Sequence, residues 1–194
     1  MILFLLFALI LAKIKGYKIK PVLTAFALYP YAAAELFYVL LQASVFMHNY
    51  SFIRYTSIIN SLYMYTLIIP VMVYKLYKPG IIGSIFMIAG TLLNRLAMSS
   101  NGGKMPVYAT LSKLTGYYDP AAIQSVDNIH VAGDASVKLK FLTDYIDTGS
   151  SILSIGDVLI HSFVFIVVYY SIKEINRNLL TNIKTEKDIT YETP

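Results

Sequence analysis

Long apolar stretches separated by short clusters of lysine constrain this chain more than any other feature. A helix needs about 20 mostly apolar residues to cross the hydrocarbon core of a bilayer, and several stretches approach that length. The chain is 57% hydrophobic and 14% charged, whereas roughly a quarter of the residues in soluble domains are charged. We therefore predict an all-α, polytopic membrane helical bundle whose main partner is the lipid bilayer.

About five transmembrane helices are predicted from these stretches and from the residues that end them. Proline suits the first turn of a helix, and Ser154 with Asp157 has the spacing of a capping box, Asp standing in for Glu. The first stretch is followed by lysines, unlike a secretory signal, so we interpret it as a retained helix. The expected spans are Met1 to about Tyr17, Pro21 to about His48, Arg54 to Tyr74, Pro79 to about Ser99 and Ser154 to about Ile172.

The lysines indicate the orientation of the bundle. If all the spans cross, the clusters at 13–20, 75–78 and 173–187 fall on one side, which the positive-inside rule makes cytoplasmic. We expect the N-terminus outside and the C-terminus in the cytoplasm. The bundle then covers 1–172, and 173–194 forms a polar cytoplasmic tail that begins as a helical extension and frays near Glu186.

One long extracytoplasmic loop, from about 101 to 151, is expected to carry short interfacial helices. Val107, Leu111 and Leu114 lie at helical spacing, which predicts a short helix over Pro106–Gly116. The stretch 139–146 predicts a second one, and 115–136 looks irregular. Asn101-Gly102-Gly103 predicts the sharp turn that ends the fourth span.

Polar residues inside membrane spans are costly and need partners, so they indicate a candidate site. At 1.5 Å per residue, Glu35 and Arg95 lie about 21 and about 24 Å from the cytoplasmic end, in the same outer layer as Asn60 and His161. We predict a polar pocket there, roofed by the Asn101 loop, with Glu35 and Arg95 as an ion pair. The remaining candidates for this pocket or for ligand binding are Asn94, Asn101, Gly102, Gly103, His130, Asp144 and Asp157.

Each of these features also has a purely structural interpretation. An ion pair between Glu35 and Arg95 would equally serve to hold two helices together. A helix with glycines at 80, 83 and 90 is typical of close helix packing. His161 suits a hydrogen-bonded core residue, and Asp157 suits a helix start. His130 with Asp127 and Asp134 has the spacing of a metal site, but irregular loops contain such spacings by chance. We predict no metal and no cofactor.

Several function classes find no support in the residues. The absence of cysteine excludes disulfides and thiolate chemistry, and no nucleotide-binding loop, nucleophile elbow or zinc-protease motif is present. The long loop has too few aromatic residues and too little net positive charge to predict a nucleic-acid partner. The lack of an internal repeat argues against the common inverted-repeat transporters.

The segments Asn101-Gly-Gly-Lys-Met-Pro-Val107 and Ser154-Ile-Gly-Asp-Val-Leu-Ile160 resemble motifs of a family of small bacterial membrane proteins, a domain of unknown function. His130 resembles the loop histidine of that family. Val137 and Thr143 depart from its Thr and Gly in a third block ending at Asp144. The resemblance implies a bacterial plasma-membrane protein, but no activity. It groups one constellation of residues: Asn94, Asn101, Gly102, Gly103, His130, Asp144 and Asp157.

We favour an accessory or binding protein that holds a partner or small ligand through the Asn101 loop and the pocket beneath it. The partner would be another membrane or envelope protein, or a second copy of the chain. Whether the protein is an enzyme stays open. An intramembrane enzyme on a lipid-linked or peptide substrate would use Asp144, His130 or Asp157 as acid–base groups and the Asn101-Gly102-Gly103 amides for an anion. A small ion or solute carrier would use Glu35 and His161.

Overall fold

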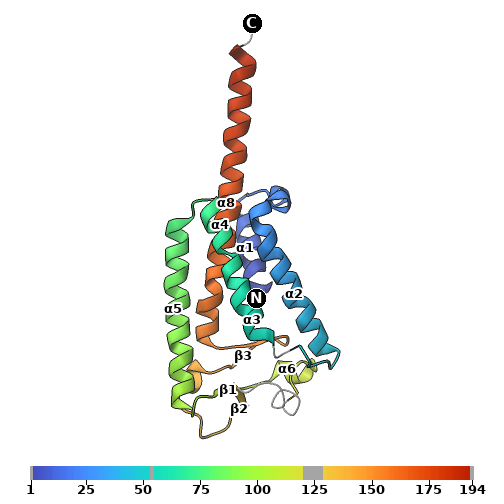
Figure 1. The fold of residues 1–194 in the computed structure, drawn as a ribbon, viewed down its shortest axis with the longest axis vertical. Helices are drawn as coiled ribbons and strands as arrows, with labels where there is room; N and C mark the ends of the chain where they lie inside the picture. The colour runs from blue at the N-terminus through green and yellow to red at the C-terminus, as the bar shows by residue number, and fades with distance from the viewer. Residues whose placement is uncertain (1, 53–54, 120–128, 193–194) are drawn as a thin grey trace.

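Two long antiparallel helices, α5 (Tyr77–Ser100) and α8 (Ile155–Glu192), pack side by side, with α5 at the edge of the bundle (Figure 1). The computed structural model describes residues 2–52, 55–119 and 129–192, without the side chains of 56, 57, 60 and 182–192. Both helices are long and apolar enough to cross a membrane, over Tyr77–Ser100 and Ile155–Thr181. At 1.5 Å per residue α5 is about 36 Å long, which exceeds a hydrocarbon core of ~30 Å. The fourth and fifth expected spans are therefore helices of spanning length.

Glycines bring the backbones of α5 and α8 into direct contact. A Cβ atom added at Gly90 would lie 2.3 Å from the carbonyl oxygen of Gly156, and one at Gly83 would lie 2.5 Å from the ring of Phe163. No side chain fits such a gap, so the small-residue stripe serves helix packing, as the sequence predicts. The stripe also sets the register of the pair, with the C-terminal part of α5 beside the first turns of α8.

Of the remaining helices, α1 (Ile2–Ile14) and α4 (Ile68–Val73) pack against α8. The first helix, α1, runs parallel to α8: the rings of Phe4 and His161 are 5.5 Å apart, and those of Tyr17 and Tyr169 are 6.2 Å apart. The helices α2 (Tyr29–Phe46) and α3 (Thr56–Thr66) pack together, and α5 lies on the opposite side of the bundle from α2. The fully buried side chains of the core include Tyr63, Leu67, Val164, Val167 and Ile172.

The expected second span does not begin at Pro21. Two short 3₁₀ helices, η1 (Lys20–Thr24) and η2 (Phe26–Leu28), precede α2. Pro30 explains the late start, because proline has no N–H to donate to the carbonyl four residues earlier and its ring collides with that carbonyl. Pro30 instead takes a place in the first turn of α2, where its N–H is not needed.

The expected third span is broken in the middle. It consists of α3 and a separate six-residue helix, α4 (Ile68–Val73). The break is at Leu67, and Pro70, three residues later, cannot donate to the carbonyl of Thr66, the last residue of α3. Arg54, at the expected start of this span, lies outside the described residues. The first span is also shorter than expected, because Gly16, at φ 80°, follows the end of α1.

The C-terminal tail is more regular than expected. The helix α8 continues without interruption past 172, the expected end of the bundle, to Glu192. The expected fraying from about Glu186 is therefore wrong for the residues up to 192. No Gly or Pro occurs between Asp157 and Thr193 to stop the helix. This part of α8 projects beyond the other helices (Figure 1).

The loop between α5 and α8 contains short strands as well as helical turns. Strand β1 (Met105–Val107) pairs in parallel with β2 (His130–Ala132), and β3 (Ile146–Asp147) pairs antiparallel with β4 (Ile152–Leu153). We call the described residues of this loop, 101–119 and 129–154, the loop layer. It lies at the end of the bundle opposite the projecting part of α8 (Figure 1).

Both interfacial helices expected in this loop are wrong in extent. Pro106 lies in β1, and only α6 (Leu111–Leu114) remains of the helix expected over Pro106–Gly116. The second is reduced to the 3₁₀ helix η4 (Lys140–Leu142), followed by strand residues from Ile146. Strands of two or three residues are too short to show an alternating pattern in the sequence. The all-α prediction therefore holds for the bundle and fails for the loop layer.

Replacing Gly90 by Val should destabilise the protein by about 1–3 kcal/mol or more, because the new side chain meets the backbone of α8. Thermal unfolding in mild detergent measures the effect. The matched control is Ile88→Val, which places the same side chain on the exposed face of α5 and should change the melting temperature little. Equal melting temperatures for the two variants would contradict the close crossing.

Candidate functional site

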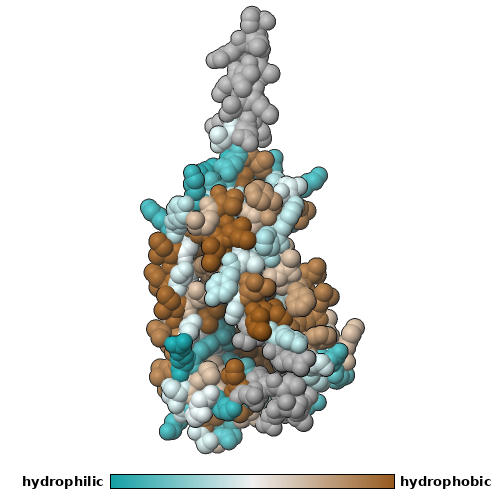
Figure 2. All heavy atoms as spheres, in the orientation of Figure 1, coloured by the Kyte–Doolittle hydropathy of each residue, from teal (hydrophilic) through white to brown (hydrophobic). Residues whose placement is uncertain are grey.

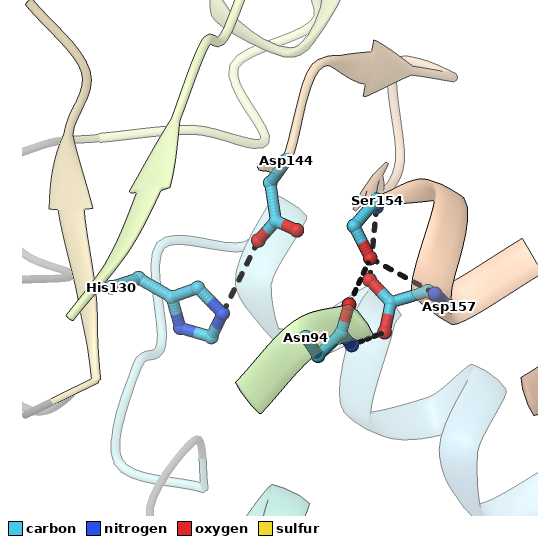
Figure 3. Close-up of polar contacts among 5 residues, drawn as sticks. All are labelled: Asn94, His130, Asp144, Ser154 and Asp157. Carbon is cyan, nitrogen blue, oxygen red and sulfur yellow. Dashed lines mark hydrogen bonds and ion pairs between the residues drawn. The ribbon is translucent and has the colours of Figure 1, made fainter. Parts of the chain in front are cut away.

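Asn94, Ser154 and Asp157 form a closed hydrogen-bonded cluster where α5 meets the start of α8 (Figure 3). The Ser154 hydroxyl accepts a bond from the Asp157 amide at 2.9 Å, and the Ser154 amide donates to Asp157 Oδ2 at 3.0 Å. This is the capping box that the sequence predicts. The side-chain nitrogen of Asn94 donates to Asp157 Oδ1 at 2.9 Å. The side-chain oxygen of Asn94 accepts from the Ser154 hydroxyl at 2.8 Å. Both oxygens of Asp157 are thus occupied, which favours its structural interpretation.

The side chain of Asn101 ties the end of α5 to the far part of the loop layer. Its amide donates to the carbonyl oxygens of Ala97 at 2.8 Å and Lys138 at 2.9 Å, and its oxygen accepts from the Lys138 amide at 2.9 Å. Gly102 and Gly103 have φ 66° and 81°, so the expected sharp turn is present. The Gly103 amide donates to Met98 at 2.8 Å. That amide closes the helix and is not directed at a bound anion.

His130 and Asp144 form an ion pair if the histidine is protonated, with 3.4 Å between Nε2 and Oδ2 (Figure 3). Asp144 is only 3% exposed, and its backbone joins the sheet: its amide donates to Pro106 at 3.1 Å and its carbonyl accepts from Tyr108 at 2.7 Å. The loop layer thus holds the carboxylate rigidly beside an imidazole that is 39% exposed. A buried carboxylate that orients an accessible imidazole is an arrangement used in general-base catalysis.

The histidine and aspartates of the loop do not assemble a metal site in the part of the chain that the structure describes. No group of three or more His, Asp or Glu side chains lies close enough together there to hold a metal ion. Asp134 instead accepts two bonds from Ser136 in a local turn, and Asp127 lies outside the described residues.

Asp147 is a key residue that the motif reasoning missed. Its carboxylate accepts bonds from the amides of Thr110 at 2.7 Å, Ser112 at 2.9 Å and Gly149 at 2.9 Å, and from the Ser112 hydroxyl. Partial burial would raise the pKa of Asp147, but these bonds outweigh it and lower the pKa to about 2. The Asp-Thr-Gly sequence, typical of a turn closed by an aspartate side chain, was the available signal.

A groove of about 280 Å³ opens in the loop layer next to Asn101. Its lining combines opposite charges, small hydroxyl groups and apolar side chains. The groove is bounded by residues from the end of α5, from β1, from β2 and from the turn after β2. The lining residues are Ser100, Asn101, Pro106, Val131, Ala132, Asp134, Ser136, Val137 and Lys138.

The structure does not bring the intramembrane candidates together as expected. The predicted ion pair between Glu35 and Arg95 is wrong: Arg95 is exposed, and both Glu35 oxygens are buried without a hydrogen-bond partner among the described residues. The reason is that α2 and α5 lie on opposite sides of the bundle (Figure 1). His161 faces Phe4 of α1, and Asn60 lies in α3 with its side chain outside the description. None of these residues lines the groove.

Replacing Asn94 by Ala should cost about 2–4 kcal/mol of stability, because the buried Ser154 hydroxyl and Asp157 each lose a hydrogen-bond partner. The melting temperature in detergent reports this loss. Ser99→Ala is the control on the same helix, since Ser99 is exposed and bonds only within its own turn. A wild-type melting temperature for Asn94→Ala would show that the cluster contributes nothing to stability.

Replacing Asp147 by Asn should remove about 1–2 kcal/mol at neutral pH, allowing for solvent screening. The pKa is lowered, from 3.8 to about 2, so this contribution is full above pH 3.8 and is lost as the pH falls through 2. The gap in melting temperature between wild type and variant should therefore shrink as the pH falls through this range. Asp134→Asn, on an exposed turn, is the control and should show little gap. A gap that is independent of pH would contradict the assignment.

Only the family comparison finds a match for this chain. No curated protein and no solved structure matches it. A family described as "Family of unknown function (DUF5317)" matches residues 19–169, well over half of the 194 residues. The match spans α2, α5, the loop layer and the first part of α8. It confirms the expectation of an uncharacterised family, and the chain belongs to the DUF5317 family.

Proposed function

We propose that this protein is a multi-pass protein of a bacterial plasma membrane, with five spans, the N-terminus outside and the C-terminus in the cytoplasm. The surface of α5 supports membrane insertion, because its apolar side chains face outward: Ile81, Ile85, Ile88 and Leu92 are each about 60% exposed. Soluble proteins rarely expose an apolar surface of this extent. On the face drawn in Figure 2, hydrophobic side chains gather along the bundle and hydrophilic ones towards its ends.

The arrangement of the lysine clusters supports the proposed orientation. The segment after α1 is tied to α8 by the backbone of Lys18, which exchanges two hydrogen bonds with Asn176 at 2.8 and 3.0 Å. The lysines around Lys18 and those after Ile172 therefore lie at one end of the bundle. The connection between α4 and α5, which carries Lys75, lies at this end as well, and Lys78 follows in the first turn of α5 (Figure 1). A shared basic end is what the positive-inside rule associates with the cytoplasm.

We assign to the protein the role of an outward-facing binding protein, with the groove beside Asn101 as its site for a partner or small ligand. The observation that carries this role is that the groove is built on a rigid frame. Asn101 is held by three hydrogen bonds, and its bonded partner Lys138 is itself part of the lining. A preformed groove loses little entropy on binding. An accessory role in a larger envelope assembly fits so small a chain.

An enzyme is the second candidate, and the His130–Asp144 pair is the observation that favours it. The pair is held at 3.4 Å with the imidazole partly exposed, as a general base requires. The other parts of that hypothesis lack support, because Asp157 and the Gly103 amide are occupied by structural hydrogen bonds. An enzyme would lose turnover in His130→Gln while its melting temperature stayed near wild type.

Native mass spectrometry of the protein released in mild detergent tests the binding role. Ala132→Trp should fill the groove and abolish a defined adduct or partner complex that wild type retains. The matched control is Leu114→Trp, which adds the same side chain at a site of the loop layer that is 85% exposed and does not line the groove. Loss in both variants, or in neither, would contradict the groove as the site.

Single-cysteine labelling tests the topology without background, because the chain contains no cysteine. A membrane-impermeant maleimide should label Leu114→Cys in intact cells, since the loop layer faces outward. Lys78→Cys, at the opposite end of the bundle, should react only after the cells are permeabilised. The reverse pattern would overturn the orientation, and labelling of both in intact cells would overturn membrane insertion of the bundle.

A further inference from the structure

Glu35 is a buried carboxylate that the groove and the loop layer do not explain. Its residue is 5% exposed on the inner face of α2, one turn after Tyr31. Both carboxylate oxygens are shielded from solvent, and neither has a hydrogen-bond partner among the described residues. Arg95, the expected counter-ion, is exposed on another helix. Such a group is expensive in a protein interior and calls for a physical reason.

Among the described residues, the surroundings of Glu35 offer hydroxyl groups and no cation paired with it. The Tyr31 and Tyr63 hydroxyls are hydrogen-bonded to each other at 3.2 Å, and their rings are 5.2 Å apart. Both phenols interact with Glu35, as does Tyr38 one turn later on α2. None of the ion pairs in the described part of the chain includes Glu35. In the part of the chain that the structure describes, the polar groups that face Glu35 are therefore phenols, from its own helix and from α3.

An ionised carboxylate in this position would be unstable. Transfer of an uncompensated charge from water into an apolar interior costs several kcal/mol or more even after the protein relaxes. Inside a membrane span the cost is not relieved by water, and such residues mark ion or proton pathways. A bound proton removes the charge and turns one carboxylate oxygen into a donor. The Tyr31–Tyr63 hydroxyl pair is the natural acceptor for it.

We propose that Glu35 is a proton-binding site inside the bundle, where the carboxylate takes up one H⁺ and the resulting carboxyl group hydrogen-bonds to the Tyr31–Tyr63 pair. The dry surroundings of this site rest on the membrane insertion proposed above, whereas the site is independent of the groove. Glu35 then gives the protein a proton-binding group in addition to a role in partner or ligand binding.

Infrared spectroscopy of the purified protein in detergent tests the protonation state directly. Wild type at neutral pH should show the carbonyl band of a protonated carboxyl group. Glu35→Gln should lack the band, and Tyr63→Phe should shift it because one hydrogen-bond partner is gone. The control is Glu174→Gln, since Glu174 is paired with Arg177 and should contribute no such band. A wild type without the band at neutral pH overturns the proposal.

Labelling with dicyclohexylcarbodiimide, which attacks protonated carboxyl groups in apolar sites, gives an independent readout. Peptide mapping of wild type should place one label on Glu35. This result needs no variant, so it holds even if Glu35→Gln fails to fold. If sodium ions at constant pH protected Glu35 from the label, the site would bind a metal cation in place of the proton. That result would overturn the proposal. Neither readout depends on the groove. A failure of the Glu35 site can therefore be told apart from a failure of the groove as a binding site.

Discussion

The backbone contact between α5 and α8 is the constraint on which the rest of the structure depends. Gly90 and Gly156 approach so closely that a Cβ atom on either one would overlap the other helix. One turn beyond the contact, Asn94 reaches Ser154 and Asp157, and the three side chains satisfy one another. The end of α5 and the start of α8 are therefore held together at the same place by close backbone packing and by hydrogen bonds. The loop layer is anchored at both of its ends by this junction.

Polar side chains bonded to distant backbone groups hold the loop layer together. Asn101 reaches Lys138, and Asp147 gathers the amides of Thr110 and Ser112. Strands of two or three residues leave many backbone groups unpaired, and these side chains supply the missing partners. The result is a rigid layer with little apolar core of its own. This rigidity favours binding as the role of the groove, because the aspartates and amides that suggest chemistry are mostly engaged in support.

Local sequence rules predicted the local features well. The capping box at Ser154, the turn at Asn101-Gly102-Gly103 and the glycine stripe of α5 each depend on a few neighbouring residues, and the structure contains all three. The same kind of rule should have predicted the break before Pro70 and the late start of α2 at Pro30, since proline lacks the donor that a continuous helix needs. The expected spans continued through both prolines because the surrounding residues are apolar, and hydrophobicity carries no information about a missing hydrogen-bond donor.

Composition and periodicity by themselves determined that this is a largely helical chain with apolar helices of spanning length, and closely where α5 begins and ends and where α8 begins. Only the tertiary structure decided which polar groups meet. Residue spacing gives the height of Glu35 and Arg95 along their helices, but it does not give the order of the helices around the bundle. That order depends on close packing between segments far apart in the chain. It joins Asn94 to Asp157, leaves Arg95 exposed, and leaves Glu35 facing two tyrosines instead of a counter-ion.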